Sequence, residues 1–198
     1  RKRRTFDSIG RTLKLEFFDL NKKPINDKDL VSTVILDLNV SHQVIHYKEY
    51  DQHGSFATHL NSFNLEYEYD ILGNLKRSIN LNEDSEKASN KSGICYYTYT
   101  YDLYDNITSV KRFNKNNDPV LGKEDFHMKI EKFDDKGRTL FYGKYYPGYV
   151  LKFSEDKWGA SKYNYINDSI IHIQNLDVYN ENFEDDTGVA IIEKHLDK

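Results

Sequence analysis

The sequence predicts an all-β fold, an antiparallel meander of tandem β-hairpin repeats that forms an elongated or curled sheet. Composition, alternation of side chains and a motif that returns at a fixed interval support this prediction. Alanine, the best helix former, occurs four times in the 198 residues, whereas tyrosine occurs 16 times and phenylalanine 11 times. Because aromatic side chains suit the half-buried surface of a pleated sheet, this composition favours strands.

The alternation is clearest in residues 97–101, where Tyr97, Tyr99 and Tyr101 are separated by single threonines. Successive side chains of a strand point to opposite faces of the sheet, so the three rings would share one face. Tyr67 and Tyr69 show the same spacing further back in the chain. Both stretches are therefore predicted as strands with two different faces.

A six-residue motif recurs along the chain: an aromatic residue, Asp, two variable residues, Gly, and then Asn or Arg. The clear copies are FDSIGR at residue 6, YDQHGS at 50, YDILGN at 69, YDLYDN at 101 and FDDKGR at 133, with a weaker copy, YNYIND, at 163. The copies at 69, 101 and 133 are 32 residues apart, and residues 12–25 align without a gap on residues 107–120. This self-similarity predicts tandem units in one β-repeat domain, 1–198, with units near 6–35, 36–68, 69–100, 101–132, 133–162 and 163–198.

Each unit is predicted to contain a strand, a tight turn, a second strand and a second turn. In the tight turn the Asp side chain would accept hydrogen bonds from backbone N–H groups two or three residues further on. Gly73 and Gly137 would supply the positive φ that such a turn needs. Asp105 stands at the glycine position of the copy at 101, and Asp tolerates that conformation better than most residues.

The second strands of two units are predicted at Leu75–Leu81 and Ile107–Phe113. Asn, Asp and Pro then form the second turns, at Asp19–Pro24 and Asn114–Pro119. The polar stretch Asn82–Gly93 is predicted to be a longer loop of the same kind. A last strand is predicted at Val189–Lys194.

The order of these hairpins and the YD-x-x-GN motif resemble the tandem YD repeats of the RHS family of bacterial surface and secreted proteins. The resemblance covers residues 6–175. It implies a long antiparallel meander that serves as a scaffold or shell and carries out no chemistry of its own. It also implies a location at the cell surface or outside the cell.

Composition and charge argue against several classes of partner. The net charge is −4 and the pI about 6, whereas nucleic-acid-binding domains usually present a basic face. No apolar run approaches the length of a membrane span. The single cysteine, Cys95, excludes an internal disulfide framework. We therefore expect neither a nucleic-acid partner nor a membrane span.

We also expect no cofactor and no metal. The four histidines at positions 42, 46, 53 and 59 have a spacing that fits no metal motif. Asn114, Asn116 and Asp118 alternate as the oxygen ligands of a calcium loop do. However, Lys23 occupies one of the equivalent positions in the first unit, where an ammonium group would repel a cation.

Catalysis is not expected, because the chain has no G-x-S-x-G, glycine-rich phosphate loop or H-E-x-x-H motif. One alternative remains open. Glu66 and Glu68 would share a strand face, so they could form the carboxylate pair of a polysaccharide-active hydrolase.

The surplus of aromatic residues is the strongest indication of function. Rows of tyrosine form large amphipathic surfaces that suit a protein or glycan partner, although such rows more often serve as rungs of a repeat that cover one face of a thin sheet. We expect a non-catalytic scaffold that presents a tyrosine-rich face for protein or glycan binding. The candidate binding residues are Tyr67, Tyr69, Tyr97, Tyr99, Tyr101 and the single tryptophan, Trp158.

Overall fold

The computed structural model describes residues 1–58, 62–152, 159–167, 170–176 and 191–195. Every regular element in these residues is a β-strand. The strands are β1 (Lys2–Phe6), β2 (Thr12–Phe17), β3 (Thr33–Leu38), β4 (Val44–Tyr50), β5 (Asn64–Tyr69), β6 (Leu75–Asn80), β7 (Tyr96–Tyr101), β8 (Ile107–Phe113), β9 (Met128–Phe133), β10 (Thr139–Tyr146), β11 (Val150–Leu151), β12 (Ala160–Asn167), β13 (Ile170–Leu176) and β14 (Ile191–His195).

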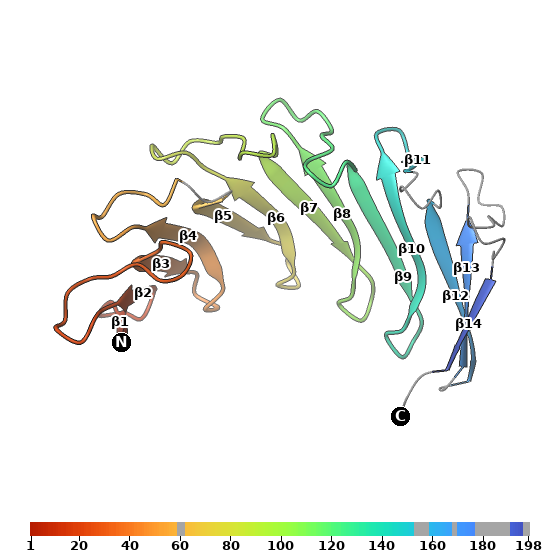
Figure 1. Cartoon of the computed structure of the whole chain (residues 1–198), viewed down its shortest axis with the longest axis horizontal. Helices are drawn as coiled ribbons and strands as arrows, with labels where there is room; N and C mark the ends of the chain where they lie inside the picture. The colour runs from red at the N-terminus through yellow and green to blue at the C-terminus, as the bar shows by residue number, and fades with distance from the viewer. Residues whose placement is uncertain (59–61, 153–158, 168–169, 177–190, 196–198) are drawn as a thin grey trace. The chain divides into compact units, whose positions relative to one another are not determined.

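The 14 described strands form one open antiparallel sheet in meander order (Figure 1). The order runs from β1 to β10 and continues through β12 and β13 to β14, while the short β11 pairs only with β10. This meander confirms the all-β fold class predicted from the sequence. It follows from the repeated tight turns, because a short connection can join only antiparallel neighbours.

The turns repeat one hydrogen-bonding pattern, which is seen well at Asp70. Its Oδ1 atom accepts hydrogen bonds from the backbone N–H groups of Leu72 and Asn74, both at 2.9 Å. The N–H of Gly73 donates to the Asp70 carbonyl at 3.1 Å, and Gly73 has a φ of 91°. The prediction that the Asp side chain accepts a bond from the backbone N–H two residues further on is thus confirmed. The prediction for the N–H three residues further on is wrong, because that N–H, from Gly73, bonds the Asp70 carbonyl instead. The second bond to the side chain comes from the N–H four residues further on.

The same pattern, with both side-chain bonds, begins at Asp7, Asp19, Asp27, Asn39, Asp51, Asn90, Asp102 and Asp134. Its fourth residue has a positive φ, which confirms the prediction for Gly73, Gly137 and Asp105. The second turns also repeat, because isolated bridges join Phe18 to Pro24 and Phe113 to Pro119. These bridges lie at matching positions of the two aligned segments, 12–25 and 107–120.

The strands belong to two compact units, each with its own apolar cluster. The N-terminal unit comprises Arg1–Tyr97 and Asn114–Asn116. In its cluster Val31, Val34 and Ala57 are buried, and the side chains of Leu15, Leu36, Tyr47 and Phe63 pack against them. The strand register places Leu15 opposite Val34 and Leu36 opposite Tyr47, so the cluster lies on one face of this part of the sheet.

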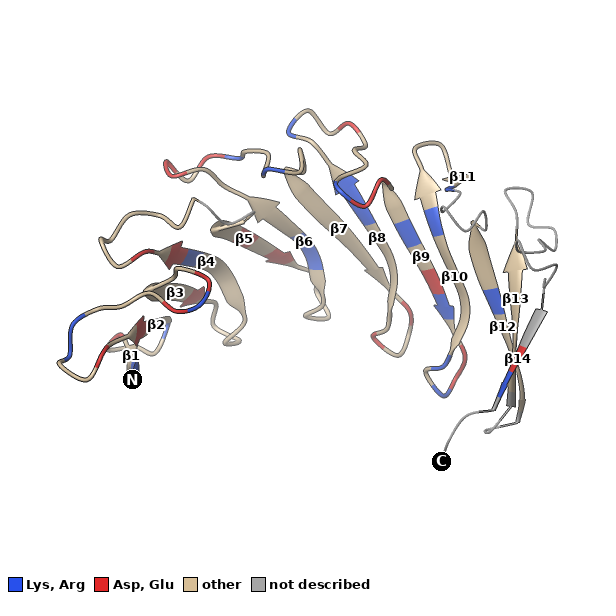
Figure 2. Ribbon diagram, in the orientation of Figure 1, with Lys and Arg blue, Asp and Glu red and all other residues tan. Residues whose placement is uncertain are grey.

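The C-terminal unit comprises Thr98–Phe113 and Asn117–Lys198. Its cluster consists of buried Leu151, Ala160 and Leu176, against which Phe141 and Tyr145 of β10 pack. Because side chains alternate along a strand, the intervening residues of β10 point to the opposite face. That opposite face carries the hollow described below. Figure 2 shows that basic positions recur on the neighbouring strands β8, β9 and β10.

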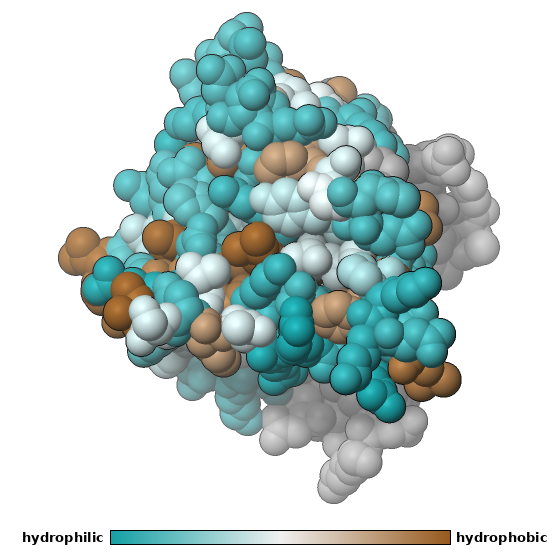
Figure 3. Space-filling model, turned by 90° about the vertical axis from the view of Figure 1, so that its left-hand side faces the viewer, coloured by the Kyte–Doolittle hydropathy of each residue, from teal (hydrophilic) through white to brown (hydrophobic). Residues whose placement is uncertain are grey.

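The surface seen from the side of the N-terminus is mostly hydrophilic, with apolar spots interrupted by hydrophilic side chains (Figure 3). Several exposed apolar side chains of the chain lie at hairpin tips, including Val40, which is 81% exposed, and Ile71, which is fully exposed. Tips of this kind protrude beyond the strands that flank them.

Candidate ligand-binding site

Three neighbouring strands of the C-terminal unit place polar and cationic side chains on one face. Val110 of β8 lies opposite Lys129 of β9, which in turn lies opposite Lys144 of β10. Arg112 and Tyr142 are each two residues along their strand from this row and therefore point to the same face. The face is the reverse of the one on which Phe141 and Tyr145 pack into the apolar cluster.

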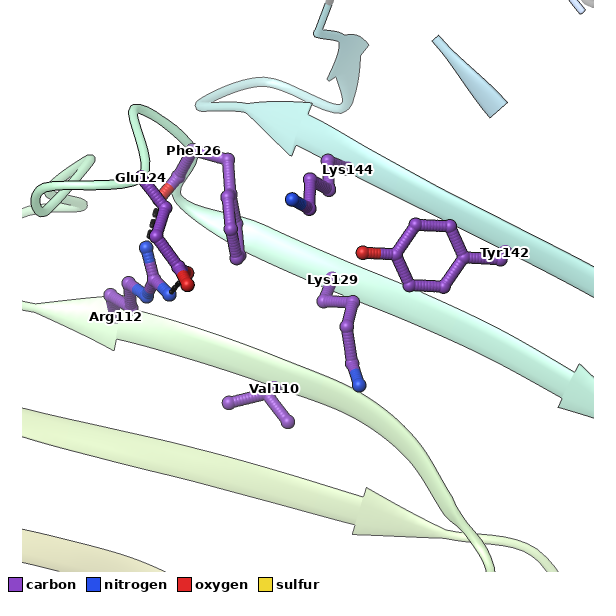
Figure 4. Close-up of a pocket in the computed structure, with 7 residues that line it drawn as sticks. All are labelled: Val110, Arg112, Glu124, Phe126, Lys129, Tyr142 and Lys144. Carbon is purple, nitrogen blue, oxygen red and sulfur yellow. Dashed lines mark hydrogen bonds and ion pairs between the residues drawn. The ribbon is translucent and has the colours of Figure 1, made fainter. Parts of the chain in front are cut away.

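These side chains surround a hollow of about 340 Å³ (Figure 4). Glu124 and Phe126, from the loop between β8 and β9, complete its lining. The loop is closed by two backbone hydrogen bonds, from Asp125 to the Gly122 carbonyl at 3.2 Å and from Phe126 to the Leu121 carbonyl at 3.1 Å. The hollow thus lies between a sheet face and a folded loop.

Arg112 holds this loop in place. Its Nη1 atom donates to the carbonyl oxygens of Leu121, at 2.9 Å, and Phe126, at 3.2 Å. Its Nη2 atom forms an ion pair with Glu124, and its guanidinium carbon lies 3.8 Å from the centroid of the Phe126 ring. The side chain is only 12% exposed. Both Nη atoms of Arg112 therefore already have partners in the loop. Arg112 adds positive charge to the hollow, but its Nη donors are not available to a ligand.

The two lysines of the hollow differ in their partners. Lys129 lies 3.0 Å from Glu131 in an ion pair, and its Nζ atom is 5.9 Å from the centroid of Tyr142. The Nζ atom of Lys144 lies 4.9 Å from the centroid of Phe126. The side chain of Lys144 makes no hydrogen bond or ion pair within the described part of the chain. It is thus a cation whose N–H donors remain available.

Tyr142 offers a second donor. Burial, together with the nearby carboxylates of Glu131 and Glu124, raises the pKa of its hydroxyl above the ordinary value. The hydroxyl is therefore protonated at neutral pH, and it has no hydrogen-bond partner among the described residues. In Figure 4 it points toward the space between Lys144 and Lys129.

Two of the sequence-predicted tyrosines share the face of the hollow. Thr100 lines a second hollow, of about 420 Å³, together with Met128 and Ile130, which alternate with Lys129 and so lie on the opposite face. Because Tyr99 and Tyr101 flank Thr100 on β7, their side chains point to the face of Lys129 and Tyr142. Both tyrosines are half-buried.

The remaining predicted tyrosines, Tyr67, Tyr69 and Tyr97, lie in the N-terminal unit. All three are half-buried. The Tyr69 hydroxyl donates a hydrogen bond to the Val44 carbonyl at 2.8 Å, and Tyr67 lies opposite Ser78. Their role in binding stays a prediction. Trp158 lies outside the described residues.

Glu66 and Glu68, considered as a carboxylate pair, lie on β5 and point away from the tyrosine face of that strand. Glu66 lies opposite His46 and Ile79. Glu68 is opposite Arg77 and forms an ion pair with it at 3.5 Å.

Two further features concern metals and membranes. Within the described residues, no group of three or more His, Cys, Asp or Glu side chains is placed to hold a metal ion. The same residues contain no helix with the length and apolar character that crossing a bilayer requires.

The hollow itself was not predicted from the sequence. The sequence gives only a weak indication of the hollow. A lysine and another polar residue stand two positions apart on one strand, as Lys129 and Glu131 do on β9 and Tyr142 and Lys144 on β10. Many exposed strands share that pattern, and only the register of three strands brings these residues together. The chain matches no protein-family model and no curated protein.

Proposed function

We propose that this chain is a non-catalytic β-repeat scaffold that binds a glycan through the tyrosine-bearing face of its C-terminal unit. The observation that carries the proposal is the hollow between β8, β9 and β10. There the side chains of Tyr142 and Lys144 present donors that have no hydrogen-bond partner among the described residues, beside aromatic and cationic side chains. The resemblance of the repeats to the YD repeats of bacterial surface and secreted proteins supports a scaffold role and a location at the cell surface or outside the cell.

The dimensions and lining of the hollow support a small ring-shaped ligand group. Binding sites for small ligands commonly have volumes of roughly 300–1,000 Å³ and combine aromatic walls with a few polar groups. The hollow, at about 340 Å³, lies at the small end of that range. It would hold one sugar ring, and the half-buried Tyr99 and Tyr101 on the same face would contact further units of a chain.

A glycan array tests the proposal, followed by affinity electrophoresis on the polysaccharides that bind. Tyr142→Ala should weaken retention because it removes a ring and a donor from the hollow. Tyr149→Ala is the matched control, since Tyr149 is 65% exposed and lines the second hollow on the other face. Its retention should equal that of the unmodified protein.

Two results would contradict the proposal. One is an array on which no glycan is retained while a panel of surface proteins gives a signal, which would assign the face to a protein partner. The other is retention that Tyr142→Ala and Tyr149→Ala reduce equally, which would place the binding elsewhere.

A further inference from the structure

The hollow has an excess of positive charge. Arg112, Lys129 and Lys144 line it, whereas Glu124 is the one carboxylate among its lining residues in the described chain. The hydrogen bond from Arg112 lowers the pKa of Glu124 below its ordinary value, and the charges of Arg112, Lys144 and Lys129 act in the same direction. The positive potential of all three cations therefore reaches the position of an anionic group in this hollow.

The loop already shows how a carboxylate is accommodated here. The Glu124 carboxylate pairs with Arg112 at one end of the hollow, and the side chain remains 61% exposed. At the other end lie Lys144 and Tyr142, where the neighbouring carboxylate, Glu131, is already paired with Lys129 (Figure 4). An ammonium group and a hydroxyl that both donate into one space form a site for a second carboxylate.

We infer that the hollow selects an acidic sugar, and that a uronate carboxylate binds between the Nζ atom of Lys144 and the hydroxyl of Tyr142. This inference rests on the proposed glycan-binding function. Lys129 provides longer-range attraction, because its ammonium is already paired with Glu131. The Phe126 ring, which is 4% exposed, forms an apolar wall behind Lys144.

The charge of the chain favours a uronate over a polyanion such as nucleic acid. The protein has a net charge of −4, so a long, densely charged strand would be repelled outside the hollow. A glycan that carries an isolated uronate among neutral rings places a single charge in a single hollow and avoids this repulsion. It also offers hydroxyl groups to the neighbouring tyrosines on the same face.

The test compares an oligosaccharide that carries a single glucuronate among glucose units with the all-glucose oligosaccharide of equal length, by isothermal titration calorimetry. Lys144→Met keeps most of the side chain and removes the charge. We expect it to weaken binding of the acidic sugar by about tenfold or more, the usual effect of losing a charged hydrogen bond. Lys132→Met is the matched control, since Lys132 lies on β9 with its Nζ atom 5.8 Å from the Phe141 ring, on the opposite face. It should leave the affinity unchanged.

Tyr142→Phe provides a second variant that keeps the ring and the packing. It should weaken binding of the acidic sugar by several-fold and leave that of neutral sugars unchanged, because only the hydroxyl is lost. Circular dichroism of each variant confirms that the fold is retained.

The outcomes separate the inference from the proposed function. If neutral and acidic sugars bind equally and Lys144→Met changes neither, the acidic selectivity is wrong but the glycan-binding function stands. If no sugar binds, both fail. Equal losses in Lys144→Met and Lys132→Met would indicate diffuse attraction to polyanions and overturn the inference. So would tight binding of a polyglutamate peptide that depends on Lys144 when uronate does not bind.

Discussion

A small residue in the middle of β10 allows two aromatic rings to close over the apolar cluster of the C-terminal unit. A Cβ atom added to Gly143 would lie 3.0 Å from Cε2 of Tyr145 and 3.2 Å from the ring of Phe141. Gly143 lies opposite Ala160 of β12, which is fully buried, so the residue on the neighbouring strand also has a small side chain. The rings of residues 141 and 145 occupy the space that larger side chains at these two positions would fill.

Gly143→Val should therefore destabilise the protein by about 1–3 kcal/mol, because the added methyl groups force both rings out of their present positions. Urea unfolding followed by tyrosine fluorescence measures the change. Leu140→Val is a suitable control on the same strand, since Leu140 is 38% exposed and can lose a methylene without strain. Equal stability of Gly143→Val and the unmodified protein would show that the rings can move aside freely.

Tyr99 tests whether the tyrosine row serves the sheet, the ligand or both. Its ring is half-buried in β7, so Tyr99→Ala should destabilise the protein by about 1–3 kcal/mol through lost burial and lost cross-strand contacts. Thr100→Ala, at the exposed neighbouring position, should change stability little. An unchanged melting temperature together with lost glycan binding would assign the ring to the ligand alone.

At the scale of the element, the recurring turn depends on one side-chain oxygen. Asp70→Ala removes the acceptor of two backbone N–H groups, those of Leu72 and Asn74, and should cost about 1–2 kcal/mol in thermal or urea unfolding. Asp70→Asn should keep most of the stability, since Asn39 and Asn90 support the same turn elsewhere. A large loss in Asp70→Asn would mean that the charge, rather than the acceptor, holds the turn.

The turn at Asp102 should make stability depend on pH in the acidic range. A hydrogen bond from the Asn106 side chain, aided by the backbone N–H groups of Tyr104 and Asn106, lowers the pKa of Asp102 despite an opposing effect of desolvation. The unfolded chain, with an Asp pKa of about 3.9, takes up the proton first as pH falls. The contribution of Asp102 is thus complete above that pH and is lost as pH falls through the lower folded pKa.

Asp102→Asn isolates this effect, because asparagine retains an acceptor oxygen and cannot take up the proton. The gap in melting temperature between the unmodified protein and Asp102→Asn should narrow from about pH 6 to about pH 3. A gap that stays constant over this range would show that Asp102 does not titrate differently in the folded state. Asp105→Asn, at the exposed positive-φ position of the same turn, serves as the control for loss of a charge.

The turns and strands could be predicted because their determinants are local. The motif and its spacing located β8 at Ile107–Phe113, and the alignment of residues 12–25 with 107–120 anticipated the equivalent bridges at Pro24 and Pro119. Turns without glycine were harder to recognise. Lys22 and Leu30 take positive φ because the acceptor at the first position holds the backbone, and that acceptor is the only local signal.

The candidate site could not be predicted because its determinants are not local. Lys129 and Lys144 come together only through the register of β9 and β10, which sequence alternation alone does not fix. Arg112 contacts Glu124 only because the loop between β8 and β9 folds back over the strand, and no sequence motif predicts this loop conformation. The tyrosine row could be predicted because its residues alternate along one strand, whereas the cations of the hollow come from three strands and show no such period in the sequence.

For the whole molecule, the meander order means that the described strands are hydrogen-bonded to the strands that precede and follow them along the chain, except that β10 pairs with β12 past the short β11. Stability in such an array is close to a sum of unit and interface contributions. The 32-residue spacing then has a direct consequence: one unit contains two strands. Removal of residues 101–132 takes out β8 and β9 and joins Thr100 to Phe133, so the turn at Asp134 replaces the turn at Asp102.

Because β7 and β9 run in the same direction, this deletion lets every remaining strand keep its direction and every side chain its face. We expect a folded protein with a β-type circular-dichroism spectrum and a lower melting temperature. Removal of residues 101–116 takes out β8 alone, so each later strand would have to reverse direction to pair, and that variant should aggregate or fail to fold. If the two deletions behave alike, whether both fold or both collapse, the 32-residue segment is not a structural unit, and the scaffold proposal loses the periodicity on which it depends.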